Sequence, residues 1–166
     1  FAREVRVWVE DCGIKVTAFF NSLETDPDKK CDGLPVLNKL TNNSSWYVVG
    51  VGDPVLKEKL HLMAQSTGLR LLEAVIHPSA YVGRNVQLGN GTIICPRSVL
   101  TTNISVGRNC AINLNCTLGH DVTMGDYATL SPGVHVSGNC DVGRRAYVGT
   151  GAVIREKLYI GEDAVL

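Results

Sequence analysis

The chain has 166 residues, 45% of them hydrophobic and 19% charged, which suits a globular protein and excludes a disordered tail. Lys and Arg number 16, as do Asp and Glu, so no net charge draws the chain to nucleic acid or to an anionic membrane. No stretch approaches the roughly 20 apolar residues of a membrane span, and no secretory signal pattern is seen, so we expect neither.

The first part of the chain, residues 1–75, is predicted to be a small α/β domain. A first helix is expected to end at Gly13 and to present an apolar face made of Val5, Val9 and Cys12. Pro54 stands at the first position of a second, amphipathic helix that ends at Gly68. Runs rich in β-branched, aromatic or aliphatic residues predict strands at residues 14–20, 44–53 and 69–76. This alternation is typical of a small parallel sheet.

The second part, residues 76–166, repeats every six residues. Sixteen successive positions at this spacing carry an aliphatic side chain, from Ile76, Val82 and Leu88 through to Ile160 and Leu166. A small or β-branched residue usually follows four places later, as at Ala80 or Val134. This is the hexapeptide signature of a parallel β-helix, because a 3.6-residue helical period cannot hold a six-residue phase for so long.

Three hexapeptides are expected to close one triangular coil, with the aliphatic side chains stacked inside on those of the next coil. A coil buries its face only against its neighbours. We therefore expect the edge at Leu166 to be covered by further coils or a helix.

The six cysteines do not suggest a disulfide framework. Cys110, Cys116 and Cys140 share the phase of the repeat that holds small buried side chains, which predicts reduced thiols in a cytoplasmic protein. No CxxC pair or His/Cys cluster has zinc spacing, so no metal site is expected.

One titratable pair interrupts the repeat, at His120 and Asp121. His120 comes two places after an inward aliphatic residue, so it should point outward from a corner. An adjacent carboxylate can raise the basicity of an imidazole and hold its tautomer, as a general base requires. A step of 18 residues places Gly138 beside His120, where its N–H could stabilise an oxyanion. The alternative is an exposed histidine without a role.

The other histidines are assigned lesser roles. His135 is interpreted as a surface or interface residue, His77 as structural at the entry to the first coil, and His61 as a solvated residue of the second helix.

The hexapeptides, the α/β part and the stretches VIHPSAYVGRNVQLGNGTIICPRSVL and LGHDVTMGDYATLSPGVHVSGN resemble the sialic acid O-acetyltransferases and UDP-N-acetylbacillosamine N-acetyltransferases. The resemblance covers essentially the whole chain. It implies a homotrimer of left-handed β-helices, each preceded by a Rossmann-like sugar-nucleotide-binding domain. Acetyl-CoA is then the acyl donor and lies between neighbouring helices, without a metal ion.

The same resemblance assigns residues. It makes His120 the general base and Asp121 the acid that tunes it. The positions matched to the cofactor are Thr129, Gly138 and Thr150. Those matched to the acceptor or nucleotide-sugar are Asn21, Ser22, Gly52, Asp53, Lys57 and Asn113.

The chain departs from the family at three places. Thr129 stands where bacillosamine-type members carry a second histidine, and Asn21-Ser22 stands in place of an acidic pair. The family's first strand and Gly-rich loop are absent from residues 1–75, so the start is interpreted as missing a segment, as the C-terminal coils are at the other end.

The preferred hypothesis is N-acetylation of a nucleotide-linked amino sugar for glycan or polysaccharide biosynthesis. The alternatives are O-acetylation of sialic acid or another sugar hydroxyl, and a non-catalytic assembly module. A zinc site of the carbonic anhydrase kind is disfavoured, because His120 and His135 are not a multiple of 18 residues apart and so share no corner.

Overall fold

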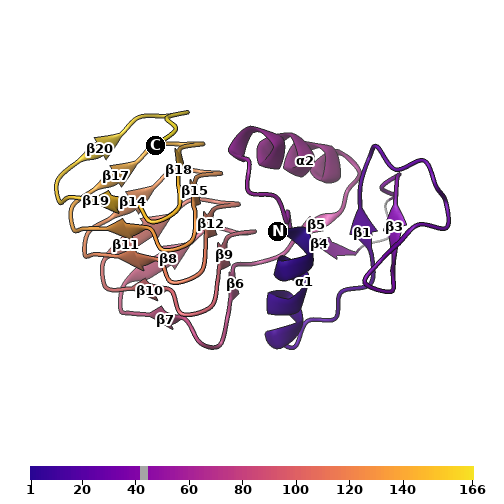
Figure 1. Ribbon diagram of the computed structural model, residues 1–166, viewed down its shortest axis with the longest axis horizontal. Coiled ribbons are helices and arrows are strands. Elements are labelled where there is room, and N and C mark those ends of the chain that lie inside the picture. The colour runs from indigo at the N-terminus through magenta and orange to yellow at the C-terminus, as the bar shows by residue number, and fades with distance from the viewer. Residues whose placement is uncertain (42–44) are drawn as a thin grey trace.

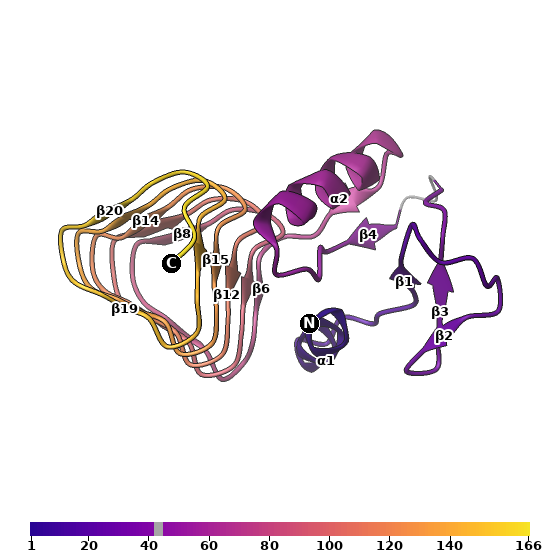
Figure 2. The same ribbon diagram turned by 45° about the horizontal axis from the view of Figure 1, so that its top comes forward.

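The computed structural model describes residues 1–41 and 45–166. Most of the chain forms a three-sided parallel β-helix, and the rest packs against one of its sides (Figure 1). The coils form a triangle when viewed along their axis (Figure 2). The predicted β-helix is confirmed.

Three parallel five-stranded sheets make the sides of the prism. The docking sheet, which faces the N-terminal half, consists of β6 (Val75–Ile76), β9 (Ile93–Ile94), β12 (Ala111–Ile112), β15 (Thr129–Leu130) and β18 (Tyr147–Val148). The second sheet consists of β7 (Tyr81–Val82), β10 (Val99–Leu100), β13 (Thr117–Leu118), β16 (His135–Val136) and β19 (Val153–Ile154). The third consists of β8 (Val86–Leu88), β11 (Ile104–Val106), β14 (Thr123–Met124), β17 (Asp141–Val142) and β20 (Tyr159–Ile160).

The register within each sheet follows the repeat. Paired residues are 18 positions apart, as in Leu100↔Leu118 and Ala111↔Thr129, so three hexapeptides make one coil as predicted. Each strand directs its aliphatic residue inward, and Leu100, Leu118 and Val136 stack in one buried column. Because each coil contributes the same inward set, the core extends the length of the prism.

Positive backbone φ angles recur at the corners. The outer corner, formed by the turns between the second and third sheets, has φ near 55–59° at Asn85, Asn103, Asp121 and Asn139. Asn and Asp tolerate this left-handed conformation better than other residues with a side chain. Four of the five turns of the outer corner therefore use Asn or Asp at this position, and Lys157 adopts the same conformation in the fifth, with a φ of 60°.

The predicted packing role of the cysteines agrees with the structure. All six thiols are free, and Cys110, Cys116 and Cys140 are buried in the prism. Their Sγ–H groups donate to the carbonyls of Gly125, Ser131 and Arg155 at 3.1–3.2 Å. Burial raises the pKa of Cys110 to about 12 and that of Cys116 to about 11, which keeps both thiols protonated.

In the N-terminal half, the described residues form two helices and two small sheets. The helices are α1 (Ala2–Asp11) and α2 (Pro54–Ser66). One sheet consists of β1 (Phe19–Phe20), β3 (Leu34–Leu37) and β2 (Lys30–Cys31), and the other of β4 (Trp46–Tyr47) and β5 (Arg70–Leu71). The predicted strands are thus present as short segments, but they form two sheets where one was expected. Ser44, at the start of one predicted strand, lies outside the described residues.

A hairpin in this half was not predicted. β2 pairs antiparallel with β3 across the two residues Asp32 and Gly33, whose φ angles are 47° and 81°. An Asp-Gly pair between two strands favours a type I′ turn, so KCDGLPVL carried the signal for this hairpin.

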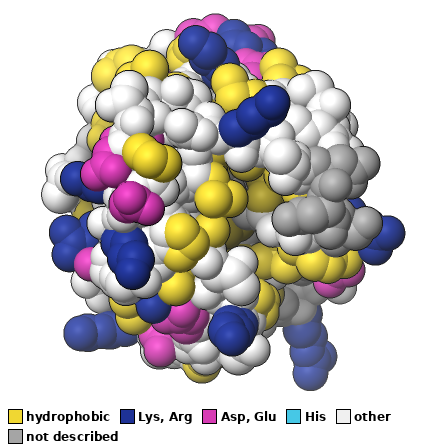
Figure 3. Space-filling view, turned by 90° about the vertical axis from the view of Figure 1, so that its right-hand side faces the viewer, with side chains coloured by type: hydrophobic (Ala, Val, Ile, Leu, Met, Phe, Trp, Pro, Cys, Tyr) yellow, Lys and Arg dark blue, Asp and Glu magenta, His cyan; other side chains and the backbone are white. Residues whose placement is uncertain are grey.

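α1 packs on the lower part of the docking sheet. Its buried side chains Val5, Trp8 and Val9 cluster with the outward-facing Val75 and Ile93. Figure 3 looks onto the opposite face of the N-terminal half, where hydrophobic side chains gather around a hollow between charged ones. The buried side chains of α1 therefore belong to the layer that touches the prism.

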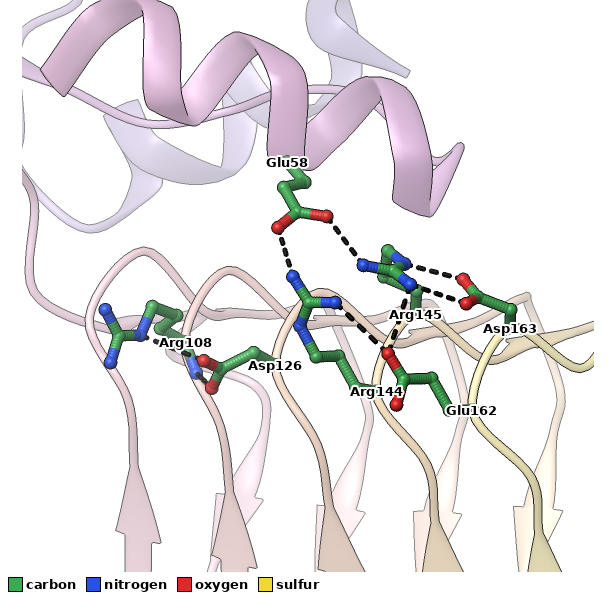
Figure 4. Close-up of polar contacts among 7 residues, drawn as sticks. All are labelled: Glu58, Arg108, Asp126, Arg144, Arg145, Glu162 and Asp163. Carbon is green, nitrogen blue, oxygen red and sulfur yellow. Dashed lines mark hydrogen bonds and ion pairs between the residues drawn. The ribbon is translucent and has the colours of Figure 1, made fainter. Parts of the chain in front are cut away.

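α2 lies along the corner between the third and docking sheets. Asp53 caps it by accepting the N–H of Leu56 at 2.7 Å, and Pro54 occupies its first turn, as predicted. Its Glu58 binds both Arg144 and Arg145, the latter at 3.0 Å (Figure 4). The two arginines in turn bind Glu162 and Asp163 on the next coil. This network fixes the helix across two coils.

The predicted solvated position of His61 was wrong. It was expected to be solvated, but it is only 4% exposed, and its Nδ1 lies 2.8 Å from the hydroxyl of Tyr47. Its ring also packs beside that of Tyr127 on the prism. Burial lowers the pKa of His61, which favours the neutral ring.

Candidate functional site

His120 and Asp121 lie together on the outer corner, in the turn between β13 and β14. The Nδ1 of His120 is 2.6 Å from Oδ2 of Asp121, and the two side chains are 58% and 46% exposed. The hydrogen bond from His120, followed by one from Asn103, holds the pKa of Asp121 below its usual value. The carboxylate therefore stays charged and can hold a proton on Nδ1, which leaves Nε2 as the basic nitrogen.

Gly138 lies directly beneath the imidazole on the next coil. A Cβ atom placed on Gly138 would lie 2.6 Å from Nε2 of His120 and 2.7 Å from its Cε1. The ring thus occupies the space that any side chain at this position would need. Within the described part of the chain the N–H of Gly138 donates no hydrogen bond, so a donor stands unused beside the basic nitrogen.

The backbone also holds the pair in place. Asp121 N–H donates to the carbonyl of Thr102 at 3.1 Å, and Asn139 N–H donates to the carbonyl of His120 at 2.9 Å. Both bonds connect neighbouring coils. The position of the pair therefore depends on the coils above and below it as well as on the contact between the two side chains.

Three of the other predicted residues meet at the docking sheet. Thr129 is buried in β15, and its hydroxyl donates to the carbonyl of Gly52 at 2.7 Å. The ammonium of Lys57 lies 2.6 Å from the same hydroxyl and 3.2 Å from the carbonyl of Tyr127. Lys57 is 1% exposed. These contacts join the N-terminal half to the prism.

The remaining predicted residues lie elsewhere. Asn113 follows β12 and accepts the N–H of Leu114, and Thr150 is exposed in the turn after β18, at the same corner of the prism. Asn21 accepts the N–H of Leu23 in the turn after β1, and Ser22 is exposed beside it. Of the predicted set, the structure brings only Gly138 to the His120–Asp121 pair.

The outer corner and the N-terminal half lie on different sides of the prism. The second and third sheets meet at the outer corner, whereas the N-terminal half covers the docking sheet (Figure 2). Consequently none of residues 1–41 and 45–75 of this chain contacts His120.

The predicted roles of the other histidines can be compared with their contacts. His77 binds Asp11 at 3.2 Å and Ser79 at 2.8 Å where the chain enters the first coil, a structural position as predicted. His135 is exposed in β16 with its Nδ1 2.8 Å from the hydroxyl of Thr117. In residues 1–41 and 45–166, no group of three or more His, Cys, Asp or Glu side chains is arranged to hold a metal ion. Nor does any helix of these residues have the length and apolarity to cross a membrane.

No protein-family model matches the chain. Among curated proteins, the bifunctional protein GlmU of Clostridium beijerinckii is 27% identical over 112 residues. That match covers 68% of this chain and 23% of GlmU, so the chain spans about a quarter of the length of this relative.

Solved structures match over nearly the whole chain. A variant of perosamine N-acetyltransferase from Caulobacter crescentus, in complex with CoA and GDP-perosamine, is 29% identical with a TM-score of 0.90, covering 99% of this chain and 80% of that one. WeeI from Acinetobacter baumannii AYE is 27% identical with a TM-score of 0.83, covering 99% and 85%. The acetyltransferase domain of PglB from Neisseria gonorrhoeae FA1090, at 24% identity, shares the fold with a TM-score of 0.85 over 98% and 82%. The resemblance found in the sequence is thus confirmed: the structural neighbours of this chain are sugar N-acetyltransferases of the hexapeptide-repeat class.

Proposed function

We propose that the protein transfers an acetyl group from acetyl-CoA to the amino group of a nucleotide-linked sugar, with His120 as general base. The observation that carries the proposal is the His120–Asp121 contact of 2.6 Å, with Nε2 free above Gly138. It is supported by the neighbour solved with CoA and GDP-perosamine, which is similar over 99% of this chain.

The chemistry assigns one step to each group. Nε2 of His120 takes a proton from the sugar amine while the amine nitrogen attacks the thioester carbonyl. The N–H of Gly138 stabilises the resulting oxyanion. This attack makes the C–N bond; when the oxyanion collapses, the carbonyl re-forms and the C–S bond breaks, which leaves the amide. The imidazolium returns its proton to the departing sulfur, which leaves as CoA-SH.

A homotrimer of left-handed β-helices forms part of the proposal. An exposed corner offers no shelter from water, and a copy packed alongside would provide it. We further propose that residues 1–75 act as a Rossmann-like sugar-nucleotide-binding domain and residues 76–166 as the acyltransferase domain. The free buried thiols support a reducing compartment, the cytoplasm.

Individual contacts remain predictions. Gly138 and Thr150 would line the CoA groove, and Asn113 would contact the acceptor. Asn21, Ser22, Gly52 and Asp53 would contact the nucleotide-sugar. The contacts of Thr129 and Lys57 described above give both a structural role in addition to the predicted binding role.

The test is release of CoA thiol from acetyl-CoA with a panel of GDP- and UDP-linked amino sugars, and with sialic acids as hydroxyl acceptors. We expect turnover with at least one nucleotide-linked amino sugar. His120→Ala should lower kcat by about 10²–10⁴-fold, the range for a general base, with acetyl-CoA affinity retained. Turnover by the variant at the wild-type rate would exclude His120 as the base, and turnover with sialic acids alone would exclude the amine acceptor.

A further inference from the structure

Three successive coils carry a continuous side-chain hydrogen-bond chain that ends at His120. Asn85 Nδ2 donates to Oδ1 of Asn103 at 3.1 Å, and Asn103 Nδ2 donates to Oδ1 of Asp121 at 3.2 Å. The other oxygen of Asp121, Oδ2, accepts from Nδ1 of His120 at 2.6 Å. All four side chains belong to the outer corner, and Asn85, Asn103 and Asp121 are equivalent residues of their coils, 18 positions apart.

The direction of each bond gives the chain a function. An amide has both a donor and an acceptor, so Asn103 can accept from Asn85 and donate to Asp121 at the same time. Because the Asn103 amide donates to Oδ1 of Asp121, the Asp121 carboxylate is fixed with Oδ2 toward the imidazole of His120. A fixed carboxylate holds the proton on Nδ1 and keeps the lone pair of Nε2 available.

We propose that Asn103 is a positioning residue for the base, with Asn85 holding its amide in orientation. This inference rests on the proposed role of His120, and it adds a residue that touches neither acceptor nor acetyl-CoA. Asn103 acts only through Asp121.

Backbone conformation alone does not account for this arrangement. Asn139 has a φ of 56°, like the 55° of Asn103, and occupies the equivalent place one coil beyond Asp121. Its side chain makes no hydrogen bond within the described residues, whereas that of Asn103 makes two. Asn139 is therefore a matched control, because replacing either residue by Ala imposes the same strain on a left-handed turn.

The experiment measures the tautomer of His120 by long-range ¹H–¹⁵N NMR on uniformly labelled protein, at a pH where the ring is neutral. Wild type and Asn139→Ala should show the Nδ1–H form. Asn103→Ala should show a substantial share of the Nε2–H form, together with a kcat about tenfold lower at unchanged KM for acetyl-CoA, the effect of losing one hydrogen bond to a charged group. A single Nδ1–H form and wild-type kcat in Asn103→Ala would overturn the proposal.

A second variant guards against misfolding. Asn103→Asp keeps the shape and tolerates the same φ, but it has no donor at neutral pH and adds a negative charge beside Asp121. It should lose at least as much kcat as Asn103→Ala and shift the acidic limb of kcat/KM to higher pH, because the added charge favours the imidazolium. An acidic limb and a kcat that both stay at wild-type values would also contradict the role of Asn103. The tautomer readout needs no turnover, so it remains interpretable if His120→Ala proves fully active and the proposed function fails.

Discussion

At the scale of single residues, the outer corner depends as much on a missing side chain as on those present. The His120 ring can contact Asp121 only because Gly138 leaves the space beneath it empty. Gly138 does not have a positive φ, so the need for glycine here arises from close approach.

Gly138→Ala is therefore expected to displace the base while leaving the coil intact. A methyl group 2.6 Å from Nε2 forces the ring away from Asp121, and kcat should fall by about 10–100-fold, part of the full effect of a general base. The measurement is kcat alongside the melting temperature.

Gly161→Ala is the control, because a Cβ at Gly161 meets no heavy atom within 4 Å. It should retain wild-type kcat. Equal kcat in Gly138→Ala would show that the ring adopts another position during turnover.

Sequence reasoning located this pair but not its support. The 18-residue step placed Gly138 beside His120, and the structure has Gly138 in contact with the ring. What the step cannot supply is side-chain direction. The donor role of Asn103 depends on rotamers, and these are set by the neighbouring coils and are not encoded in the spacing.

At the scale of secondary-structure elements, α2 is attached to the prism through the buried ammonium group of Lys57, which contacts no carboxylate among the described residues. Burial lowers the pKa of Lys57 to about 8, with Cys110 and Asp53 opposing the shift. The ammonium binds the carbonyls of Tyr127 and Ala128 and the hydroxyl of Thr129. These bonds offset part of the cost of burial.

The stability of the protein should therefore depend on the titration of Lys57. Below about pH 8 the lysine is protonated in the folded and the unfolded chain. Between about 8 and the ordinary 10.5 only the unfolded chain holds the proton, so stability due to Lys57 rises with pH across this window. Relative to Lys57→Met, the free energy of unfolding of wild type should increase by about 2–3 kcal/mol from pH 7 to pH 10.5.

Urea unfolding at the two pH values measures this difference. Other groups titrate in the same range, and comparison with the variant removes their common contribution. The exposed Lys59 on the same helix provides the control Lys59→Met, which should parallel wild type. Parallel behaviour of Lys57→Met would mean that the ammonium is hydrated in solution.

The elements differ in how far the sequence predicts them. The prism follows from an aliphatic residue at every sixth position, repeated sixteen times. Its coils and strand register could therefore be predicted from the sequence. The N-terminal half has no repeat, and its short strands depend on tertiary contacts, so one predicted sheet became two. His61 was misplaced because the helix buries a polar face against Tyr127 and Tyr47, which hydrophobic periodicity does not reveal.

At the scale of the whole molecule, the two predicted halves of the site do not meet within one chain. The N-terminal half covers the docking sheet, and the base lies at the corner between the two other sheets (Figure 2). If the N-terminal half holds the nucleotide-sugar, its amine must reach the His120 of a neighbouring copy. The proposed trimer would then be a condition of catalysis.

Complementation between two inactive variants tests this arrangement. His120→Ala lacks the base. Gly52→Trp should block the proposed nucleotide-sugar site with its indole. A Cβ at Gly52 meets no heavy atom within 4 Å, so the fold should tolerate a side chain there. Each variant alone should be inactive.

Co-refolded at equal amounts, the two variants should recover about one quarter of wild-type activity per site, because about a quarter of random neighbour pairs combine an intact His120 with an intact N-terminal half. Sedimentation equilibrium of the same samples gives the number of copies in the assembly. If base and sugar site belonged to a single chain, mixing would restore nothing, because each chain carries one of the two defects. A mixture that assembles yet stays inactive would therefore place acceptor and base in the same subunit and exclude the site between neighbours.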